Sequence, residues 1–317
     1  MMNKDIILQK LEAARQQLNE AMEMMKSETV VEPPETIIVS QPVEEPPTRS
    51  PEKRALIVGI NKYDPALNCD LSGCVNDANN MKSILESRYG FTKIVMLTDF
   101  EATQKNILAS LGDMIDGAIA GDQLVFTFSG HGSQVPDANG DETDSYDEIL
   151  CPTDLNFDAP LSDDVLATYF KRVPDGAQLT FLSDSCHSGT VSRGLNLINK
   201  HQKRTMRYLQ PPLSILEKLK GKKKANRIGQ KAVVEAAQNI ILFAGCKEDN
   251  YSYEGYFNNI VQGAFTWNFC KMCRQNPQRT WREAEDIVRN KLISYGYPQE
   301  PQLVTRAENF DLLLFGG

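Results

Sequence analysis

Apolar and polar positions follow two different periods along residues 54–182. Short apolar runs such as 124–128 and 179–182 are typical of strands buried on both faces, and they alternate with stretches of helical spacing. The pattern predicts strands at 55–60, 94–97, 124–128 and 179–182, and helices at 75–86, 103–119 and 163–171. Strict alternation of strand and helix predicts an α/β fold with a mostly parallel central sheet sandwiched by helices.

The pattern resumes near the C-terminus after a long polar interruption. A strand is predicted at 240–244, a helix at 264–274, a capping box at Thr280 to Glu283 that opens a helix ending near residue 294, and a last apolar strand at 310–315. The apolar runs before and after the interruption have the same character. We therefore expect both in one sheet, with the residues between them as a surface excursion.

The N-terminal residues have a different composition. Residues 1–26 carry apolar positions at alternating spacings of four and three, which predicts an amphipathic helix, either docked on its own domain or binding a partner. Residues 27–52 are rich in Pro and Glu and are predicted to be a linker. The remaining chain divides into a catalytic region at 53–190, a basic surface loop at 191–236, and a second region of the same domain at 237–317.

Composition and charge limit the possible compartments and partners. The 317 residues carry a net charge of -8 and seven cysteines, an odd number that suits a reducing compartment. Since no apolar run approaches a membrane span, we expect a cytoplasmic protein without a membrane partner. Residues 200–231 hold eleven Lys or Arg and one acid. This segment is a solvated loop, a self-cleavage segment or a nucleic-acid patch, and no nucleic-acid partner is predicted.

Two reactive side chains each follow a predicted buried strand. His131 comes after the strand at 124–128, and Cys186 comes after the strand at 179–182. The chain has three histidines; His187 adjoins the cysteine, and His201 lies in the basic segment, so His131 is the candidate base. A neutral thiol is a weak nucleophile that a nearby imidazole activates by taking its proton. The alternative is a buried structural cysteine with a capping histidine.

Several ordered motifs resemble those of the metacaspases, including the prokaryotic orthocaspases. They are Leu-Ser-Gly-Cys-Val-Asn-Asp at 71–77, Ser-Gly-His-Gly-Ser-Gln at 129–134, Asp-Ser-Cys-His-Ser-Gly-Thr at 184–190, Ala-Gly-Cys-Lys-Glu-Asp-Asn-Tyr-Ser at 244–252 and Gly-Ala-Phe-Thr-Trp at 263–267. The resemblance implies a caspase-hemoglobinase fold in a single-chain protein with an N-terminal extension, in which 53–190 is the large-subunit-like and 237–317 the small-subunit-like region. It also implies a Cys-His dyad, cleavage after Arg or Lys, and a monomer.

The resemblance also assigns the residues around the dyad. The amides of Cys186 and Gly132 are expected to donate to the oxyanion. By resemblance, the substrate pocket is lined by Cys74, Asp77, Ser129 and Asp184. The charge of Asp77 and Asp184 favours a basic residue before the cleaved bond and repels an acidic one. Asp77 has the alternative role of complementing a helix N-terminus, and Asp184 that of a turn former.

Three acidic residues are candidate ligands for a calcium ion. Asp147, Asp163 and Asp164 match carboxylates that bind calcium in the family, but the remaining ligand position holds Ser192 and Arg193 here. Calcium is therefore a possible cofactor, a solvated acidic loop is the alternative, and no organic cofactor is expected.

The sequence thus predicts a cysteine endopeptidase acting on proteins after Arg or Lys. We also expect a basic residue of the chain itself, within 218–227, to occupy the pocket until it is cut. Two alternatives remain: a catalytically quiet adaptor acting through residues 1–52, and a caspase-type peptidase specific for Asp.

Overall fold

The computed structural model describes residues 15–17, 19–20, 49–136, 146–186, 204–219, 239–247 and 251–317. The chain divides into two compact units, Met1–Arg49 and Ser50–Gly317. In the first unit, residues 15–17 and 19–20 are helical, and most of the predicted amphipathic helix and of the linker lies outside the described residues. The second unit contains the sites discussed below.

A six-stranded sheet forms the centre of the second unit. Its order is β12-β9-β7-β3-β1-β2, and every neighbouring pair is parallel except β9 with β12. The strands are β1 (Lys53–Gly59), β2 (Lys93–Thr98), β3 (Gln123–Ser129), β7 (Gln178–Asp184), β9 (Ile240–Ala244) and β12 (Gln302–Val304). The predicted mostly parallel sheet is confirmed, and 179–182 and 240–244 lie in one sheet as expected, where they are neighbouring strands.

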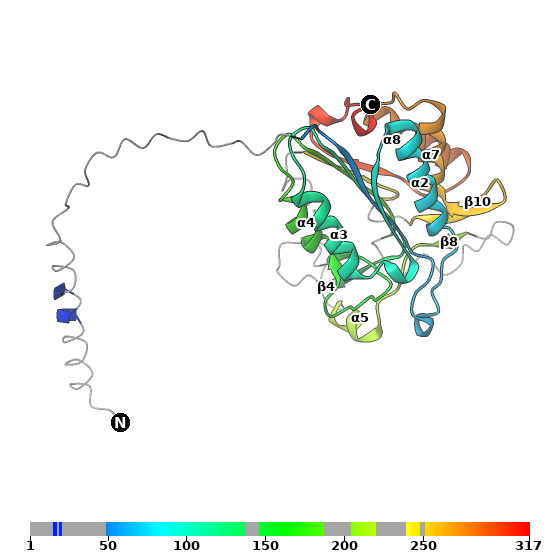
Figure 1. The fold of residues 1–317 in the computed structure, drawn as a ribbon. Coiled ribbons are helices and arrows are strands. Elements are labelled where there is room, and N and C mark those ends of the chain that lie inside the picture. The colour runs from blue at the N-terminus through cyan, green and yellow to red at the C-terminus, as the bar shows by residue number, and fades with distance from the viewer. Residues whose placement is uncertain are drawn as a thin grey trace, which may run out of the picture. The chain divides into compact units, whose positions relative to one another are not determined.

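Helices cover both faces of this sheet. Figure 1 shows α3 (Gln104–Asp116) and α4 (Asp163–Phe170) on one face, and α2 (Cys74–Tyr89), α7 (Ala264–Gln275) and α8 (Trp281–Ser294) on the other. Thr280 and Glu283 form the predicted capping box of α8. Gly90 ends α2 in the left-handed conformation at φ 71°, where a glycine costs least.

Strand side chains alternate between two hydrophobic cores. In β1, Ala55 and Ile57 pack with α2, α7 and α8, whereas Leu56 and Val58 pack with α3 and α4. A strand buried on both faces needs apolar residues at consecutive positions, which explains the unbroken apolar runs of the sequence. The sheet is thus a rigid base for the residues at its carboxyl edge.

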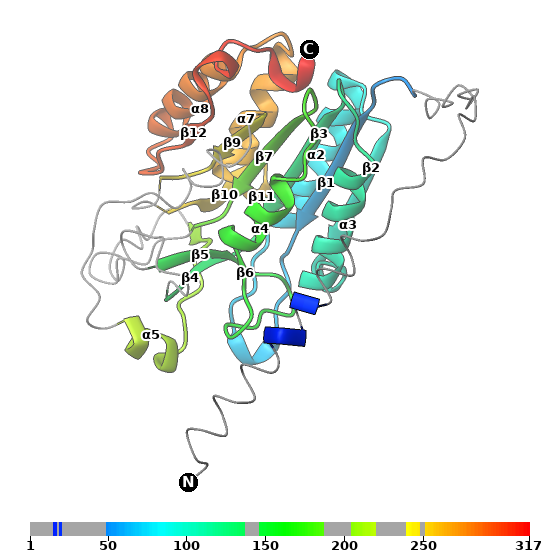
Figure 2. The same ribbon diagram turned by 90° about the vertical axis from the view of Figure 1, so that its left-hand side faces the viewer.

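Two small sheets flank the carboxyl ends of the central strands (Figure 2). One contains β4 (Gly132–Pro136), β5 (Tyr146–Leu150) and β6 (Leu161–Ser162). The other contains β8 (Thr205–Met206), β10 (Tyr253–Phe257) and β11 (Ile260–Gly263), and the helix α5 (Leu213–Leu219) follows β8. None of the described helices is long and apolar enough to cross a membrane.

The predicted strand at 310–315 is wrong. This segment forms turns that end in a short 3-10 helix, and the last strand is instead β12, paired antiparallel with β9. The apolar character has another cause: Phe315 is fully buried and makes edge contacts with Trp281 and Tyr89. A turn that buries an aromatic side chain in the core can have the same apolar composition as a buried strand.

Candidate active site

The parallel register of β3 and β7 brings the two reactive side chains to one edge of the sheet. Ser129 and Asp184 are direct partners at the ends of these strands, and His131 and Cys186 each follow two residues later. Both side chains are buried. Their proximity follows from the two apolar runs, because neighbouring parallel strands end on the same side.

A backbone carbonyl orients the imidazole of His131. Its Nε2 lies 2.6 Å from the carbonyl oxygen of Cys69, and since a carbonyl only accepts, Nε2 carries the proton. Nδ1 then has the free lone pair; it is buried and has no hydrogen-bond partner among the described residues. Burial lowers the pKa of His131, against the opposing effect of the Cys69 contact. The ring is thus held neutral, with Nδ1 available to accept a proton.

The thiol of Cys186 lies against Ser252. The amide of Ser252 donates to Sγ at 2.6 Å, and Sγ lies 3.3 Å from the Ser252 carbonyl. Within the described part of the chain, no direct hydrogen bond joins Cys186 to His131. The contact with Cys186 and burial raise the pKa of the nearby Cys246 thiol. Proton transfer to His131 therefore requires Sγ to turn away from Ser252.

Residues 205–209 cross this site in an extended conformation. The carbonyl oxygen of Arg207 accepts from the amides of Gly132 at 3.0 Å and Cys186 at 3.2 Å. On one side β8 pairs with β10, and the Arg207 amide donates to Ser252 O at 3.0 Å. On the other side the Leu209 amide donates to the Gly132 carbonyl at 2.9 Å, and the Ser133 hydroxyl donates to the Leu209 carbonyl at 2.7 Å. A protein backbone held this way resembles a peptide lying across a cleft.

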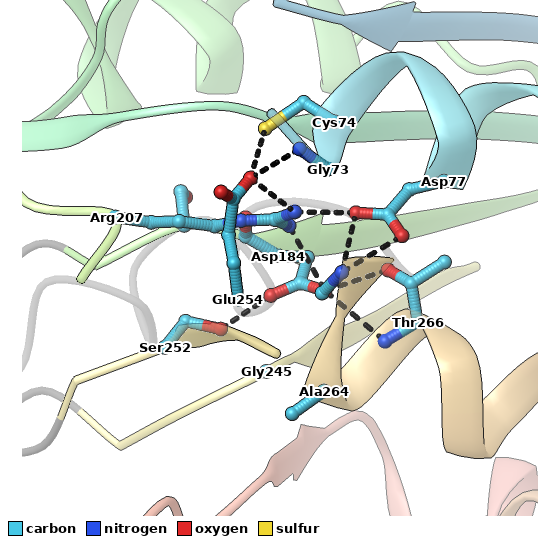
Figure 3. Close-up of polar contacts among 12 residues, drawn as sticks. Gly73, Cys74, Asp77, Asp184, Arg207, Gly245, Ser252, Glu254, Ala264 and Thr266 are labelled. Atoms are coloured by element: carbon cyan, nitrogen blue, oxygen red, sulfur yellow. Dashed lines mark hydrogen bonds and ion pairs between the residues drawn. The ribbon is translucent and has the colours of Figure 1, made fainter. Parts of the chain in front are cut away.

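The side chain of Arg207 enters a pocket of three carboxylates (Figure 3). Nη1 lies 3.1 Å from Asp184 Oδ2, and Nη2 lies 2.5 Å from Asp77 Oδ2 and 3.4 Å from Glu254 Oε1. Arg207 and Asp77 are fully buried, and the other two acids are 2% exposed. The guanidinium thus offsets part of the negative charge of three buried acids, which need partners away from water.

Two helix N-termini supply further donors to these carboxylates. At the start of α7, Gly263 N donates to Asp77 at 3.0 Å and Thr266 N donates to Asp184 at 3.0 Å. Just before α2, Gly73 N donates to Glu254 at 2.7 Å. Amides at the positive end of a helix dipole favour the ionised carboxylate. The negative charge of the pocket is thus supported by the fold itself and does not depend on Arg207 alone.

Burial changes the ionisation of Asp77, and the guanidinium contacts oppose this effect. Burial raises the pKa of Asp77 to about 7, although Arg207 acts in the opposite direction. The acids raise the pKa of the Arg207 guanidinium well above its usual value, against the effect of burial, so it stays charged at any physiological pH. Asp77 is therefore the pocket acid whose charge changes near neutral pH.

Comparisons with known proteins identify the family. A family model described as metacaspase, peptidase C14 domain, matches residues 53–193. Metacaspase-1 of Meyerozyma guilliermondii is 30% identical over 287 residues, which cover 80% of this chain and 69% of that protein. Metacaspase-1 of Emericella nidulans is 30% identical over 286 residues, covering 80% of this chain and 70% of that protein. The chain belongs to the metacaspase family.

Solved structures show the same fold. The protein GSU0716 from Geobacter sulfurreducens superposes with a TM-score of 0.60 at 24% identity, covering 84% of this chain and 98% of that one. Caspase-1 from Spodoptera frugiperda superposes with a TM-score of 0.53 at 14% identity, covering 80% and 86%. This metacaspase therefore has the caspase-hemoglobinase α/β fold and belongs to a family of cysteine-type peptidases.

The structure brings together most of the residues that the sequence assigned to the pocket. Asp77 and Asp184 contact Arg207 directly, and Cys74 Sγ lies 3.6 Å from Glu254 Oε1. Ser129 ends β3 beside Asp184 and is 5% exposed. The backbone amide of Gly132 donates to the Arg207 carbonyl, as expected of an oxyanion donor.

Three participants were missed. The carbonyl of Cys69 leaves no trace in residue identity, because every residue has one. Glu254 lies two residues after a recognised motif, at 244–252, and that closeness was the available signal. Arg207 lies in the basic segment expected to be a surface loop, but it is fully buried, and it lies outside the range 218–227 expected to fill the pocket. Local composition does not distinguish it from ten other basic residues.

The acids assigned to calcium are Asp147, Asp163 and Asp164, all within the part of the chain that the structure describes. No group of three or more His, Cys, Asp or Glu side chains with ligand geometry occurs there. Asp163 and Asp164 lie in the first turn of α4, where carboxylates complement the helix dipole, and Asp147 lies in β5. Ser192 and Arg193 lie outside the described residues. Calcium remains a prediction that a titration of peptidase activity tests, and we derive no step through it.

Replacing Gly263 with alanine tests the shape of the pocket. A Cβ there would lie 2.6 Å from Arg207 Nη1 and 2.8 Å from Asp77 Oδ2, and still closer to Asp184 Oδ2. Gly263 has φ -65°, so the alanine backbone is unstrained and only the space is lost. We expect Gly263→Ala to lower kcat/KM for peptides with a basic P1 residue, the one before the cleaved bond, by about 10- to 100-fold, the effect of roughly 1–3 kcal/mol of overpacking.

Gly112→Ala is the matched control. Gly112 is a buried glycine of α3 whose added Cβ would make an ordinary contact with Tyr169 at 3.4 Å. We expect this variant to keep the activity of the unmodified protein. Equal activity of Gly263→Ala and the unmodified protein would mean that the guanidinium position is not used by substrates.

Proposed function

We propose that this metacaspase is a cysteine endopeptidase that cleaves after Arg or Lys and uses Cys186 and His131 as its dyad. The supporting observation is Arg207, whose carbonyl accepts from two amides beside Cys186 while its side chain pairs with buried acids. A residue bound at both ends in this way has the contacts that a substrate needs at P1.

The geometry supports a defined order of proton movements. Nδ1 of His131 takes the thiol proton as Sγ of Cys186 turns from Ser252 and attacks the carbonyl carbon. The amides of Gly132 and Cys186 stabilise the oxyanion, and such donors contribute about 2.7–4 kcal/mol each. His131 then gives the proton to the leaving amine, and water hydrolyses the acyl-enzyme. The Cys69 carbonyl keeps the imidazole in the orientation that both transfers require.

Charge supports the choice of a basic P1 residue. A P1 aspartate would bring a fourth carboxylate next to Asp77, Asp184 and Glu254, and like charges in a buried site repel strongly. A guanidinium instead matches the acids with several charge-assisted hydrogen bonds. The Asp-specific alternative is therefore disfavoured. The adaptor alternative depends on residues 1–52, which lie mostly outside the described residues, and no observation favours it.

We infer that the bond after Arg207 is the self-processing site. Thr205, Met206 and Arg207 lie on the acyl side of this bond and Tyr208 and Leu209 on the side of the leaving amine, so the segment has the direction of a substrate. While it is intact, it excludes other peptides from the pocket. In this proposal the segment around Arg207 is the first substrate, and its cleavage opens the pocket to other peptides.

We also propose a cellular compartment and an oligomeric state for this protein. All seven cysteines are free, which supports a reducing compartment such as the cytoplasm. A monomer is proposed from family resemblance, and size-exclusion chromatography tests it.

Incubation of the purified chain tests the processing site. We expect mass spectrometry to detect one fragment ending at Arg207 and one beginning at Tyr208. Cys186→Ala abolishes both fragments because the nucleophile is missing. Arg207→Gln abolishes cleavage at this bond because an uncharged side chain leaves the pocket acids without a cation.

Arg227→Gln is the control for the processing experiment, since it removes the arginine of the range first expected to fill the pocket. It should be cut after Arg207 at the rate of the unmodified chain. Fragments that end only within 218–227 would contradict the assignment of Arg207.

The pH dependence of peptide hydrolysis separates the pocket from the dyad. The pKa of Asp77 is about 7 with Arg207 in the pocket, and Arg207 lowers it, so the pKa is higher once this cation has left. As pH falls, Asp77 takes up a proton and loses the charge that faces the guanidinium. KM for a P1-Arg peptide should therefore rise severalfold between pH 8 and pH 6. The pKa of His131 lies below its usual value of 6.5, so kcat should fall only at lower pH.

Asp77→Asn provides the comparison for the pH profile. KM of this variant should be high at every pH and should no longer change near pH 7. The decrease of kcat at lower pH, which we assign to His131, should remain. A KM of the unmodified chain that is constant between pH 8 and pH 6 would refute the role given to Asp77.

A further inference from the structure

The guanidinium of Arg207 divides its contacts between two nitrogens. Nη1 faces Asp184, bonding its carbonyl at 3.0 Å and its carboxylate at 3.1 Å. Nη2 lies between Asp77 and Glu254. The three acids are therefore arranged around two nitrogen positions, a spacing that a planar guanidinium fits and a single ammonium does not.

Asp77 and Asp184 form a pair that a single ammonium can satisfy. A Cβ on Gly263 would contact Oδ2 of both acids, so the two oxygens flank one point of the pocket wall. Glu254 approaches Nη2 from another wall, beside Cys74 and Gly73 (Figure 3). An ammonium drawn between the first two acids loses contact with the third.

Hydrogen bonds fix the position of the Glu254 carboxylate, so it can distinguish an arginine side chain from a lysine side chain. Its carboxylate accepts from the amides of Gly73 at 2.7 Å and Ser72 at 3.1 Å, and it is 2% exposed. A Cβ on Gly73 would lie 2.8 Å from Oε1, so a glycine is needed for this approach. Glu254 also belongs to β10, where its backbone is paired with Thr205 of the substrate-like segment. One strand therefore aligns the peptide and supplies the third acid.

We propose that Glu254 is a specificity-determining residue that makes the pocket select Arg over Lys. The proposal rests on the proposed function, namely cleavage after basic residues. Nη2 contacts Asp77 at 2.5 Å and Glu254 at 3.4 Å, while Nη1 contacts Asp184. A lysine ammonium held between Asp77 and Asp184 lacks the second terminal nitrogen that lets a guanidinium contact Glu254 as well.

The test compares kcat/KM for two fluorogenic peptides, Thr-Met-Arg and Thr-Met-Lys, which copy residues 205–207 and differ at P1. In Glu254→Gln, kcat/KM for the Arg peptide should fall about tenfold, the effect of one lost charge-assisted contact, mainly through KM. The value for the Lys peptide should fall much less, so the Arg:Lys ratio decreases. Glu254→Asp, which keeps the charge, should retain part of the ratio.

Glu285→Gln is the matched control, because Glu285 is a half-buried carboxylate of α8 that pairs with Arg289. It should leave the ratio unchanged. Equal losses for both peptides in Glu254→Gln, or no loss, would overturn the proposal; equal losses with a lower melting temperature would indicate a structural role. If the unmodified chain cleaves neither peptide, the proposed function itself fails, which is a distinguishable result.

Discussion

The burial of several carboxylates around a single cation is the constraint on which this site depends. Asp77, Asp184 and Glu254 are almost inaccessible to water, and an ionised carboxylate is costly there unless it is paired or hydrogen-bonded. The fold meets this requirement by directing the N-termini of α2 and α7 at the pocket. Because α2 follows β1 and α7 follows the β10-β11 hairpin, the pocket exists only when the two halves of the domain are assembled.

The distribution of donors supports the proposal that the pocket exchanges Arg207 for a substrate side chain. Asp184 accepts from Thr266 through both the amide and the hydroxyl, and Glu254 accepts from backbone amides, so these acids keep neutral partners without Arg207. Asp77 likewise accepts from the Gly263 amide, and burial raises its pKa to about 7. In the proposed exchange, uptake of one proton by Asp77 removes a buried negative charge when the guanidinium leaves.

Sequence reasoning succeeded where the signal is local and failed where it is assembled by the fold. Apolar runs predicted β3 and β7, and with them the closeness of His131 and Cys186, because parallel register brings their ends together. The capping box of α8 is likewise encoded within four residues. Glu254 acquires its role only when β10 meets α2, and the Cys69 carbonyl acts through a group that every residue carries. The segment at 310–315 misled because burial of Phe315 in a turn requires the same apolar composition as a strand.

Contacts made by residues on both sides of Arg207 explain why Arg207, and not a neighbouring basic residue, lies in the pocket. Arg204, three residues earlier, lies 4.1 Å from the ring centre of Tyr297 and donates to the Gly296 carbonyl, so its side chain is directed away from the acids. Leu209, two residues later, is buried in the hydrophobic core that includes α3 and α4. With both contacts in place, the backbone pairing of β8 with β10 leaves one residue facing the pocket. The extended segment therefore decides which residue lies against the acids, and the proposed preference for a basic side chain depends on their charge.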